Sequence, residues 1–167
     1  MTVTSSRIDL LRHGACEGGE IFRGSTDVAL SETGWSQMRD KVASVDEPHW
    51  DHIVTSPLQR CARFAEELSS KRGIALSVDE NLREIHFGDW EGLAHSEAQQ
   101  RDPEVWRKFW QSPDSASPPN GEAMSDFCAR VTGALDAIVQ QHSGQSVLLV
   151  VHGAVIRVMI CHWLGMP

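Results

Sequence analysis

The sequence lacks the features of a membrane or exported protein. No apolar run approaches the ~20 residues that a membrane-spanning helix needs. The first residues have neither the basic stretch nor the long apolar core of a signal peptide. The four cysteines lie far apart and form no CxxC pair (Cys16, Cys61, Cys128 and Cys161). This spacing is typical of reduced thiols, so we expect a cytoplasmic protein without membrane contact.

Positive charge is also scarce. The 15 lysine and arginine residues stand against 23 aspartate and glutamate residues, which gives a formal net charge of −8. This balance argues against nucleic acid and anionic membranes as partners. It is compatible with a small anionic substrate, because such a ligand needs only a locally cationic pocket.

The length of 167 residues fits one domain, 1–167, and no repeat or low-complexity tail interrupts it. Short apolar runs alternate with helical patterns, which favours an α/β fold with a largely parallel sheet. The expected strands are 8–11, 51–55, 74–78 and 146–151. The expected helices are 31–45, 57–70, 103–111, 124–138 and 154–164.

Local signals support several of these elements. Ser31 is a plausible N-cap of the first helix, and Ser56, followed by Pro57, is the expected N-cap of the second. The run 146–151 is apolar at five successive positions, which indicates a central strand buried on both faces.

Chemically capable residues follow three of the expected strands. The first strand leads into Arg12 and His13, the central strand leads into His152, and Arg60 follows the second strand. In open α/β sheets the ligand crevice lies outside the carboxyl ends of the strands. We therefore expect these two histidines and two arginines to meet at one edge of the sheet.

The predicted position of Arg60 suggests an anionic ligand. It falls in the first turn of a helix, where the partial positive charge of the N-terminus disfavours a cation. A bound anion would reverse this effect, since helix N-termini and arginine forks both bind phosphates. Gly14 and Gly153 carry no Cβ, so we expect the backbone to approach a ligand closely there.

Each feature also has an ordinary explanation. A lone Arg-His-Gly tripeptide is common, a histidine after an apolar strand is more often a satisfied buried residue, and Ser-Pro often opens a helix. The functional interpretation therefore depends on the occurrence of three such features at three strand ends.

The combination of arginines and imidazole suggests phosphoryl transfer. Imidazole has an unperturbed pKa near ~6.5, so a neutral ring can act as a nucleophile at neutral pH. The reaction also needs an acid for the leaving oxygen. The candidate lies in the segment 82–92, LREIHFGDWEG. A carboxylate beside a bound phosphate dianion would have a raised pKa, as that role requires.

Four ordered motifs resemble those of the histidine phosphatase superfamily, which has the phosphoglycerate-mutase-like fold. They are LLRHG at 10–14, TSPLQRC at 55–61, LREIHFGDWEG at 82–92 and VVHGAVIR at 150–157. The resemblance covers nearly the whole chain. It implies a three-layer α/β/α sandwich with a mostly parallel central sheet, and it implies no metal and no cofactor.

The resemblance also implies a role for each matching residue. His13 resembles the nucleophile that becomes phosphorylated, and Glu84 resembles the general acid that later activates water. Three residues resemble those that hold the phosphoryl oxygens, and the histidine among them is also counted as catalytic (Arg12, Arg60 and His152).

Within the superfamily, the segment around Glu84 resembles the phosphatases more than the mutases. The stretch 8–38 is most similar to bacterial α-ribazole phosphatases, which remove the 5′-phosphate of α-ribazole phosphate during assembly of the cobalamin nucleotide loop. Four alternatives stay open: a broad-specificity phosphatase, a phosphoglycerate-mutase-like phosphotransferase, a protein-phosphohistidine phosphatase and an inactive phosphate-binding module. The expected partner is a small phosphorylated metabolite. The oligomeric state is open, with a homodimer as one alternative.

Some positions depart from the family pattern RHGxTxxN. Cys16 and Gly19 stand where threonine and asparagine are usual. A polar contact is therefore either absent or supplied by Arg23. We also expect Gly24 and His86 near the substrate, although His86 could equally pack against an aromatic neighbour.

The segment 93–120 is predicted to form an insert or lid within the domain. Trp106 and Trp110 lie four residues apart there. They form either a packing stripe or a lid in which Trp110 stacks on a flat base such as dimethylbenzimidazole. Three histidines belong to no motif and are expected on the surface or on a helix face (His95, His142 and His162).

The end of the chain also departs from the family. Members usually continue with another strand after the HGxxIR helix, whereas this chain stops at Pro167. We therefore consider a truncation, which would leave an unpaired sheet edge.

Overall fold

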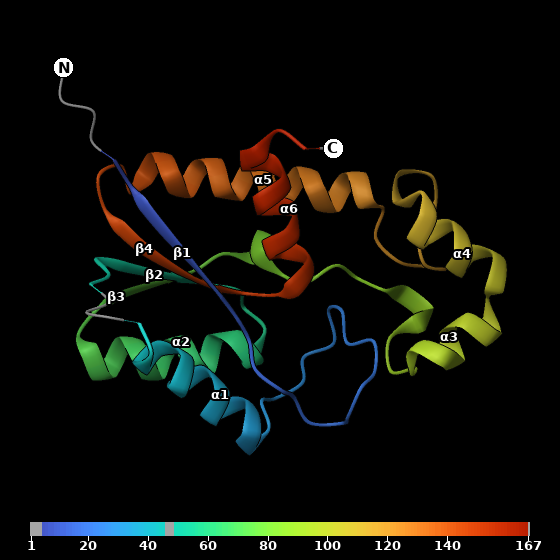
Figure 1. The fold of residues 1–167 in the computed structure, drawn as a ribbon, viewed down its shortest axis with the longest axis horizontal. Helices are drawn as coiled ribbons and strands as arrows, with labels where there is room; N and C mark the ends of the chain where they lie inside the picture. The colour runs from blue at the N-terminus through green and yellow to red at the C-terminus, as the bar shows by residue number, and fades with distance from the viewer. Residues whose placement is uncertain (1–4, 46–48, 167) are drawn as a thin grey trace.

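The computed structural model describes residues 5–45 and 49–166. Its strands form one parallel sheet in the order β1-β4-β2-β3, so β4 lies between β1 and β2 (Figure 1). The strands are Arg7–Arg12 (β1), His52–Thr55 (β2), Ala75–Val78 (β3) and Ser146–Val151 (β4). The four predicted strands and their parallel pairing are therefore confirmed. Pro167, where a truncation was considered, lies outside the described residues.

Helices cover both faces of the sheet. Helices α1 and α2 lie on one face, and α5 and α6 lie on the other (Figure 1). The helices are Glu32–Ala43 (α1), Gln59–Arg72 (α2), His95–Arg101 (α3), Pro103–Gln111 (α4), Met124–Gln141 (α5) and Gly153–Leu164 (α6). Short 3₁₀ turns span Glu80–Leu82 (η1), Gly88–Trp90 (η2) and Pro113–Ser115 (η3). Helix α3 was not predicted, because its sequence carries no apolar period.

Strand β4 shows why the fold has three layers. Val147, Leu149 and Val151 pack in the cluster formed with α5 and α6. Leu148 and Val150 alternate with them and pack in the cluster formed with α1 and α2. Successive side chains of a strand point to opposite faces, so an unbroken apolar run serves two cores. The predicted central strand and the α/β/α arrangement are confirmed.

The two predicted N-caps have different outcomes. The Ser31 side chain accepts a hydrogen bond from the Gly34 amide at 3.1 Å, as expected of an N-cap. The assignment of Ser56 was wrong, since Leu58 is the N-cap residue of α2. The Ser56 amide instead donates to the Val150 carbonyl at 3.1 Å and extends the β2–β4 pairing. The chain is therefore still extended at Ser56, and α2 begins at Gln59.

The predicted insert packs through its own aromatic cluster. Trp90, Ala98 and Phe109 are buried there together with Phe22 from the loop after β1. The Trp90 indole N–H donates to Asp102 Oδ2 at 3.0 Å. This cluster ties α3 and α4 to the loop that follows β1.

Several side chains in and near this cluster bear on the sequence predictions. The Trp106 ring lies 5.5 Å from the Trp90 ring, which fits a packing role. Trp110 stays 48% exposed, so the two tryptophans of α4 differ. His142 was expected on the surface or on a helix face; it is the C-cap residue of α5 and is buried, with its ring 4.4 Å from the His52 ring. Within the two described ranges, no helix has the length and apolarity needed to cross a membrane.

The exposure of these tryptophans makes a stability prediction. Trp90 is fully buried, so Trp90→Ala should lower the free energy of unfolding by about 3–5 kcal/mol. Trp110→Ala, the matched control, should lower it by less than about 1 kcal/mol because half of the ring is already in solvent. Urea unfolding followed by circular dichroism measures both values. Equal losses would contradict the assignment of Trp90 as the anchor of the insert.

Candidate active site

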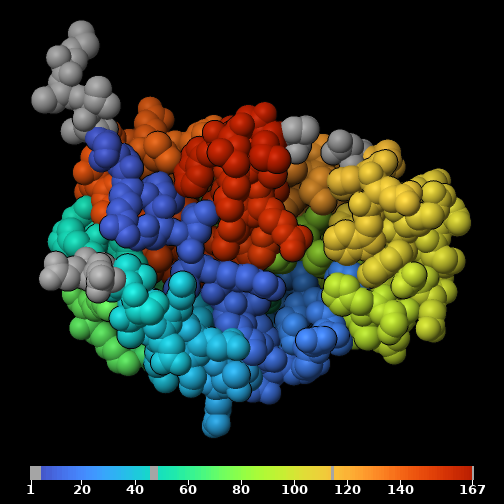
Figure 2. All heavy atoms as spheres, viewed as in Figure 1, coloured from blue at the N-terminus to red at the C-terminus, as the bar shows by residue number. Residues whose placement is uncertain are grey.

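A cleft of about 220 Å³ lies at the carboxyl edge of the sheet. Figure 2 shows this face hollowed where α6, the loop after β1 and the α3–α4 insert meet. Most of the predicted site residues line it together (Arg12, His13, Arg23, Gly24, Arg60, Glu84 and Trp110). A second cleft of about 460 Å³ shares three of them (Arg12, His13 and Arg23). The predicted convergence of the strand ends is therefore present in the fold.

The orientation of the His13 ring determines its tautomer. The His13 amide donates to the Val151 carbonyl at 3.1 Å, which fixes the residue at the end of β1. Its Nδ1 lies 2.8 Å from the Gly14 carbonyl oxygen. A carbonyl can only accept, so Nδ1 carries the hydrogen. In the neutral ring, Nε2 then holds the free lone pair.

The surroundings of His13 keep it neutral. Burial lowers the pKa of His13 from 6.5 to about 4, and it is the largest cause. The hydrogen bond to Gly14 raises the pKa, and the nearby arginine charges lower it (Arg60, Arg12 and Arg23). At neutral pH the imidazole is therefore unprotonated and nucleophilic.

Among the described residues, Arg60 is held by uncharged acceptors. Its side chain is 1% exposed, and its guanidinium donates to the Thr26 carbonyl at 2.8 Å and to the Gly24 carbonyl at 2.6 Å. A third donor, Nε, lies 3.3 Å from His152 Nδ1. A guanidinium has five N–H groups, so two of them stay available for an oxyanion in the cleft.

The N-terminus of α2 already has its own acceptor. The Gln59 amide donates to Asp27 Oδ1 at 2.7 Å, and the Gln59 side chain donates to the Asp27 carbonyl at 2.8 Å. We expected a bound anion at this helix end to offset the unfavourable position of Arg60. Asp27 occupies the helix end instead, so this expectation was wrong. Arg60 reaches the cleft through its side chain.

His152 lies behind the wall of the cleft. Its side chain is fully buried, with Nδ1 facing Arg60 Nε and with Nε2 2.7 Å from Ser56 Oγ. Arginine only donates, so His152 Nδ1 accepts and Nε2 carries the hydrogen. Burial lowers the pKa of His152 well below its usual value, and the Arg60 charge acts in the same direction. Both ring nitrogens thus have protein partners, and a direct contact of His152 with phosphate stays a prediction.

The two glycines next to the histidines serve packing. A Cβ on Gly14 would collide with the Gly34 backbone of α1. A Cβ on Gly153 would lie 3.3 Å from Arg12 Nε. Both glycines also line a cleft, so the expected close approach of a ligand there stays a prediction.

Arg23 closes the loop that contains the unusual Cys16 and Gly19. Its Nη2 donates to the carbonyls of Cys16, Glu17 and Gly19, at 3.4 Å and 3.0 Å for the first two. Its Nε is buried and has no hydrogen-bond partner among the described residues. Arg23 lines both clefts, while its Nε is buried and not exposed to either of them.

Glu84 enters the cleft from the segment between η1 and η2. Its Oε1 accepts from the Ile85 amide at 3.1 Å, and its Oε2 accepts from the Ala154 amide at 3.3 Å, in the first turn of α6. Burial raises the pKa of Glu84 above its usual value, although these two hydrogen bonds and the charges of Arg60 and Arg12 oppose the shift. A carboxyl group with a raised pKa can carry a proton.

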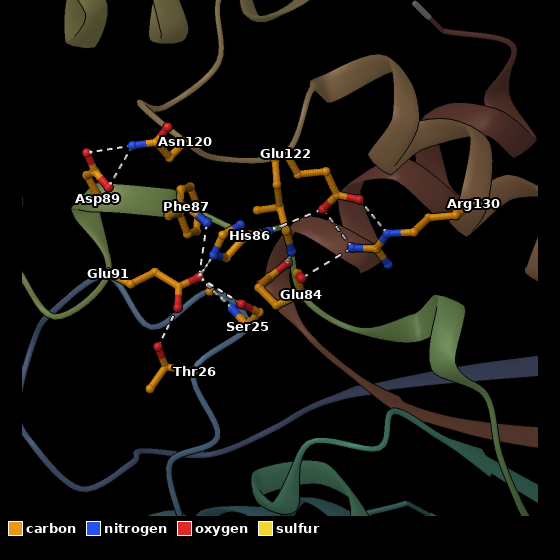
Figure 3. Close-up of polar contacts among 12 residues, drawn as sticks. Ser25, Thr26, Glu84, His86, Phe87, Asp89, Glu91, Asn120, Glu122 and Arg130 are labelled. Carbon is orange, nitrogen blue, oxygen red and sulfur yellow. Dashed lines mark hydrogen bonds and ion pairs between the residues drawn. The ribbon is translucent and has the colours of Figure 1, made fainter.

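Glu91 connects the acid segment with Arg60 and was missed by the sequence analysis. Its Oε1 accepts from the Ser25 amide at 2.8 Å and from the Phe87 amide at 3.1 Å, and its Oε2 accepts from the Thr26 hydroxyl (Figure 3). The same turn, residues 24–26, supplies the two carbonyls that hold Arg60. Glu91 therefore fixes the turn on which the orientation of Arg60 depends.

The outer wall of the cleft is aromatic and carries one more cation. His95 stacks on Phe22 with ring centroids 4.2 Å apart, and both line the cleft with Trp110 and Arg157. His95 is exposed, as expected, but its place in the wall of the cleft was not predicted, because its contact with Phe22 leaves no local sequence signal. His86 does not line the cleft; its Nε2 lies 3.8 Å from Glu91 Oε1.

The cleft concentrates positive charge, although the Glu84 carboxyl group also lines it. Four arginines line it, and none of them forms an ion pair with another described residue (Arg12, Arg23, Arg60 and Arg157). Seven arginines outside it do form ion pairs (Arg7, Arg39, Arg63, Arg83, Arg101, Arg107 and Arg130). In a protein of net charge −8, this distribution produces a locally positive field that favours anions.

In the part of the chain that the structure describes, no group of three or more His, Cys, Asp or Glu residues is arranged to hold a metal ion.

The fold and the cleft define a parallel α/β protein in which His13 and four arginines line one cleft. A family model described as the histidine phosphatase superfamily (branch 1) matches residues 8–167. The chain therefore belongs to the histidine phosphatase superfamily, as its motifs indicated.

Individual relatives cover different shares of their own length. A bifunctional protein of Mycobacterium tuberculosis is 36% identical over 94% of this chain, which spans 44% of that relative. A glucosyl-3-phosphoglycerate phosphatase of Mycolicibacterium vanbaalenii is 31% identical over 96% of this chain and 75% of that protein. The solved α-ribazole phosphatase of Shigella flexneri is similar in structure, with a TM-score of 0.85 and 29% identity over 96% of this chain and 81% of that one.

The environment of His13 predicts its titration. The imidazole should gain a proton only as the pH falls through about 4, because burial disfavours the charged ring. Nitrogen-15 NMR of the free protein measures this midpoint, and His13→Gln assigns the signal. At neutral pH, the nitrogen-15 chemical shifts of the His13 ring should show the hydrogen on Nδ1. A midpoint at 6 or above would contradict the account.

Proposed function

We propose that this protein is a metal-independent phosphomonoesterase that acts through a phosphohistidine at His13, and that its substrate is α-ribazole 5′-phosphate. The chemistry is supported by three features that occur together in one cleft. These are a neutral His13 with a free Nε2, four arginines without an ion-pair partner among the described residues, and a buried Glu84 with a raised pKa.

The first half-reaction transfers the phosphoryl group to the protein. His13 Nε2 attacks phosphorus, and the bond between phosphorus and the leaving oxygen breaks. Glu84 gives its proton to that oxygen, so the alcohol leaves neutral and Glu84 becomes a carboxylate. This step needs a neutral His13 ring and a protonated Glu84. The lowered pKa of His13 and the raised pKa of Glu84 favour these two states.

The second half-reaction returns Glu84 and His13 to their starting states. Water attacks phosphorus while the Glu84 carboxylate takes one of its protons. The bond between phosphorus and Nε2 then breaks, which releases inorganic phosphate and the neutral imidazole. A mutase would instead transfer the phosphoryl group to a substrate hydroxyl at this stage.

Arginine side chains supply the charge that stabilises the phosphoryl group. Arg60 offers its two remaining N–H groups, and the side chains of Arg12 and Arg23 line the cleft with the nucleophile. His152 acts by orienting Arg60, since its Nδ1 accepts from the guanidinium. Such preorganised donors stabilise the charge on the transferring group without reorganisation during the reaction.

The aromatic wall supports a substrate with a flat base. Phe22, His95 and Trp110 lie on the side of the cleft away from the sheet, where the leaving group would extend. An exposed indole can stack on a benzimidazole ring. The structural similarity to the Shigella α-ribazole phosphatase is consistent with this substrate.

Arg157 supports a second candidate, a broad-specificity phosphatase that also accepts phosphorylated acids. It lies one helical turn beyond Gly153 on α6 and has no ion-pair partner among the described residues. A cation at this position could bind a carboxylate of the leaving group. The relative from Mycolicibacterium is named for such an acidic substrate.

A substrate panel distinguishes the two candidates. With EDTA present, kcat/KM for α-ribazole 5′-phosphate should exceed that for 3-phosphoglycerate, sugar phosphates and nucleotides by about 100-fold, equivalent to about 2.7 kcal/mol. Phosphate release measures each rate, and His13→Ala should abolish all of them. Similar rates across the panel, including 3-phosphoglycerate, would favour the second candidate. Unchanged activity in His13→Ala would contradict the proposed mechanism itself.

The stacking role of Trp110 is tested by a ratio of rates. Trp110→Ala should lower kcat/KM for α-ribazole 5′-phosphate relative to glycerol phosphate by about tenfold, because a base–aromatic stack contributes about 1–3 kcal/mol. Trp110→Phe should restore most of the ratio. An unchanged ratio in Trp110→Ala would exclude the stack.

A further inference from the structure

The segment that carries Glu84 is fastened to α5 by one side chain. Glu84 lies between η1 and η2, outside any helix or strand. The Arg130 guanidinium donates to three carbonyls of this segment, at 2.6 Å to Asn81, 2.9 Å to Arg83 and 3.2 Å to Glu84. These contacts fix the backbone of the proposed general acid.

Glu122 holds Arg130 from the other side. Arg130 Nε donates to Oε1 at 2.6 Å and Nη2 donates to Oε2 at 2.9 Å, which is a bidentate pair (Figure 3). Glu122 also binds the same segment directly. Its Oε2 accepts from the His86 amide at 3.2 Å, and its own amide donates to the His86 carbonyl at 2.9 Å.

The pair lies in a partly buried place that restricts its geometry. The side chains of Arg130 and Glu122 are 22% and 18% exposed. The Arg130 guanidinium also lies 4.8 Å from the centre of the Phe127 ring. A planar, bidentate guanidinium has little freedom to move under these contacts. Neither residue of the pair lines the cleft, so neither is placed to touch the substrate.

We propose that Arg130 and Glu122 are positioning residues for the general acid. This inference depends on the proposed function, because it assigns the pair to the proton transfer by Glu84. The pair holds the Glu84 backbone so that the carboxyl group lies within hydrogen-bond reach of the leaving oxygen. Proton transfer depends steeply on that reach, and a misplacement of about 1 Å can lower a rate by about 100-fold.

The ratio of the rates for two esters with different leaving groups provides a readout that a general loss of protein stability would not change. An alkoxide such as that of glycerol needs a proton as it departs, whereas 2,4-dinitrophenolate departs without one. Loss of the acid in Glu84→Gln should therefore slow glycerol phosphate by about 10²–10⁴-fold and slow 2,4-dinitrophenyl phosphate much less. A residue that acts through Glu84 should produce the same selectivity.

The test measures kcat/KM for both esters in the full chain. Arg130→Met should lower the rate for glycerol phosphate at least about tenfold more than the rate for 2,4-dinitrophenyl phosphate. Arg130→Lys and Glu122→Gln, which keep more of the contacts, should show the same selectivity to a smaller degree. The double variant Arg130→Met/Glu84→Gln should be no slower on glycerol phosphate than Glu84→Gln alone.

Arg39→Met is the matched control. Arg39 forms a similar bidentate pair with Glu67, at 3.0 Å and 2.8 Å, and does not line the cleft. Its loss should leave the ratio of the two rates unchanged. Equal losses on both esters in all three variants of the pair, or additive losses in the double variant, would overturn the positioning role. If Glu84→Gln itself shows no selectivity, the assignment of the acid fails and the positioning role fails with it.

Discussion

A buried arginine that has no ion-pair partner among the described residues is the constraint on which the site depends. Arg60 is 1% exposed and is held by two carbonyls and His152. Burial of an unpaired charge is unfavourable by several kcal/mol, so an anion that enters the cleft binds a group prepared for it. The same charge lowers the pKa of His13 and that of His152. The Glu91 contacts to the 24–26 turn maintain this arrangement.

The two histidines at the sheet edge differ in tautomer because their neighbours differ. His13 donates from Nδ1 to a carbonyl, whereas His152 accepts at Nδ1 from an arginine. Only His13 therefore has a free ring nitrogen. The two rings lie 5.2 Å apart, so two protonated rings would repel each other. Burial lowers the pKa of both histidines and keeps both rings neutral. The parallel sheet brings them together, since β1 and β4 are adjacent and end at the same edge.

The sequence predicted the strands, the α/β/α arrangement and the cluster at the strand ends, because period, strand length and residue type are local signals. It did not predict α3, the stack of His95 on Phe22, or the links that Glu91 and Arg130 make. The stack, the bond from Ser25 to Glu91 and the bond from Arg130 to Glu84 join residues more than 45 positions apart and leave no pattern in either segment. Ser56 was misassigned because its chain still pairs with β4, which only the tertiary structure determines.

The central claim is that a phosphoryl group resides on His13 during turnover. The most direct measurement is mass spectrometry of Glu84→Gln, in which hydrolysis of the intermediate is slowed, after reaction with 2,4-dinitrophenyl phosphate and a quench in base. The account predicts one phosphoryl group on the peptide that contains His13, stable in base and lost in acid. If Glu84→Gln releases 2,4-dinitrophenol but carries no phosphoryl group on that peptide, or carries it on another residue, the account is contradicted.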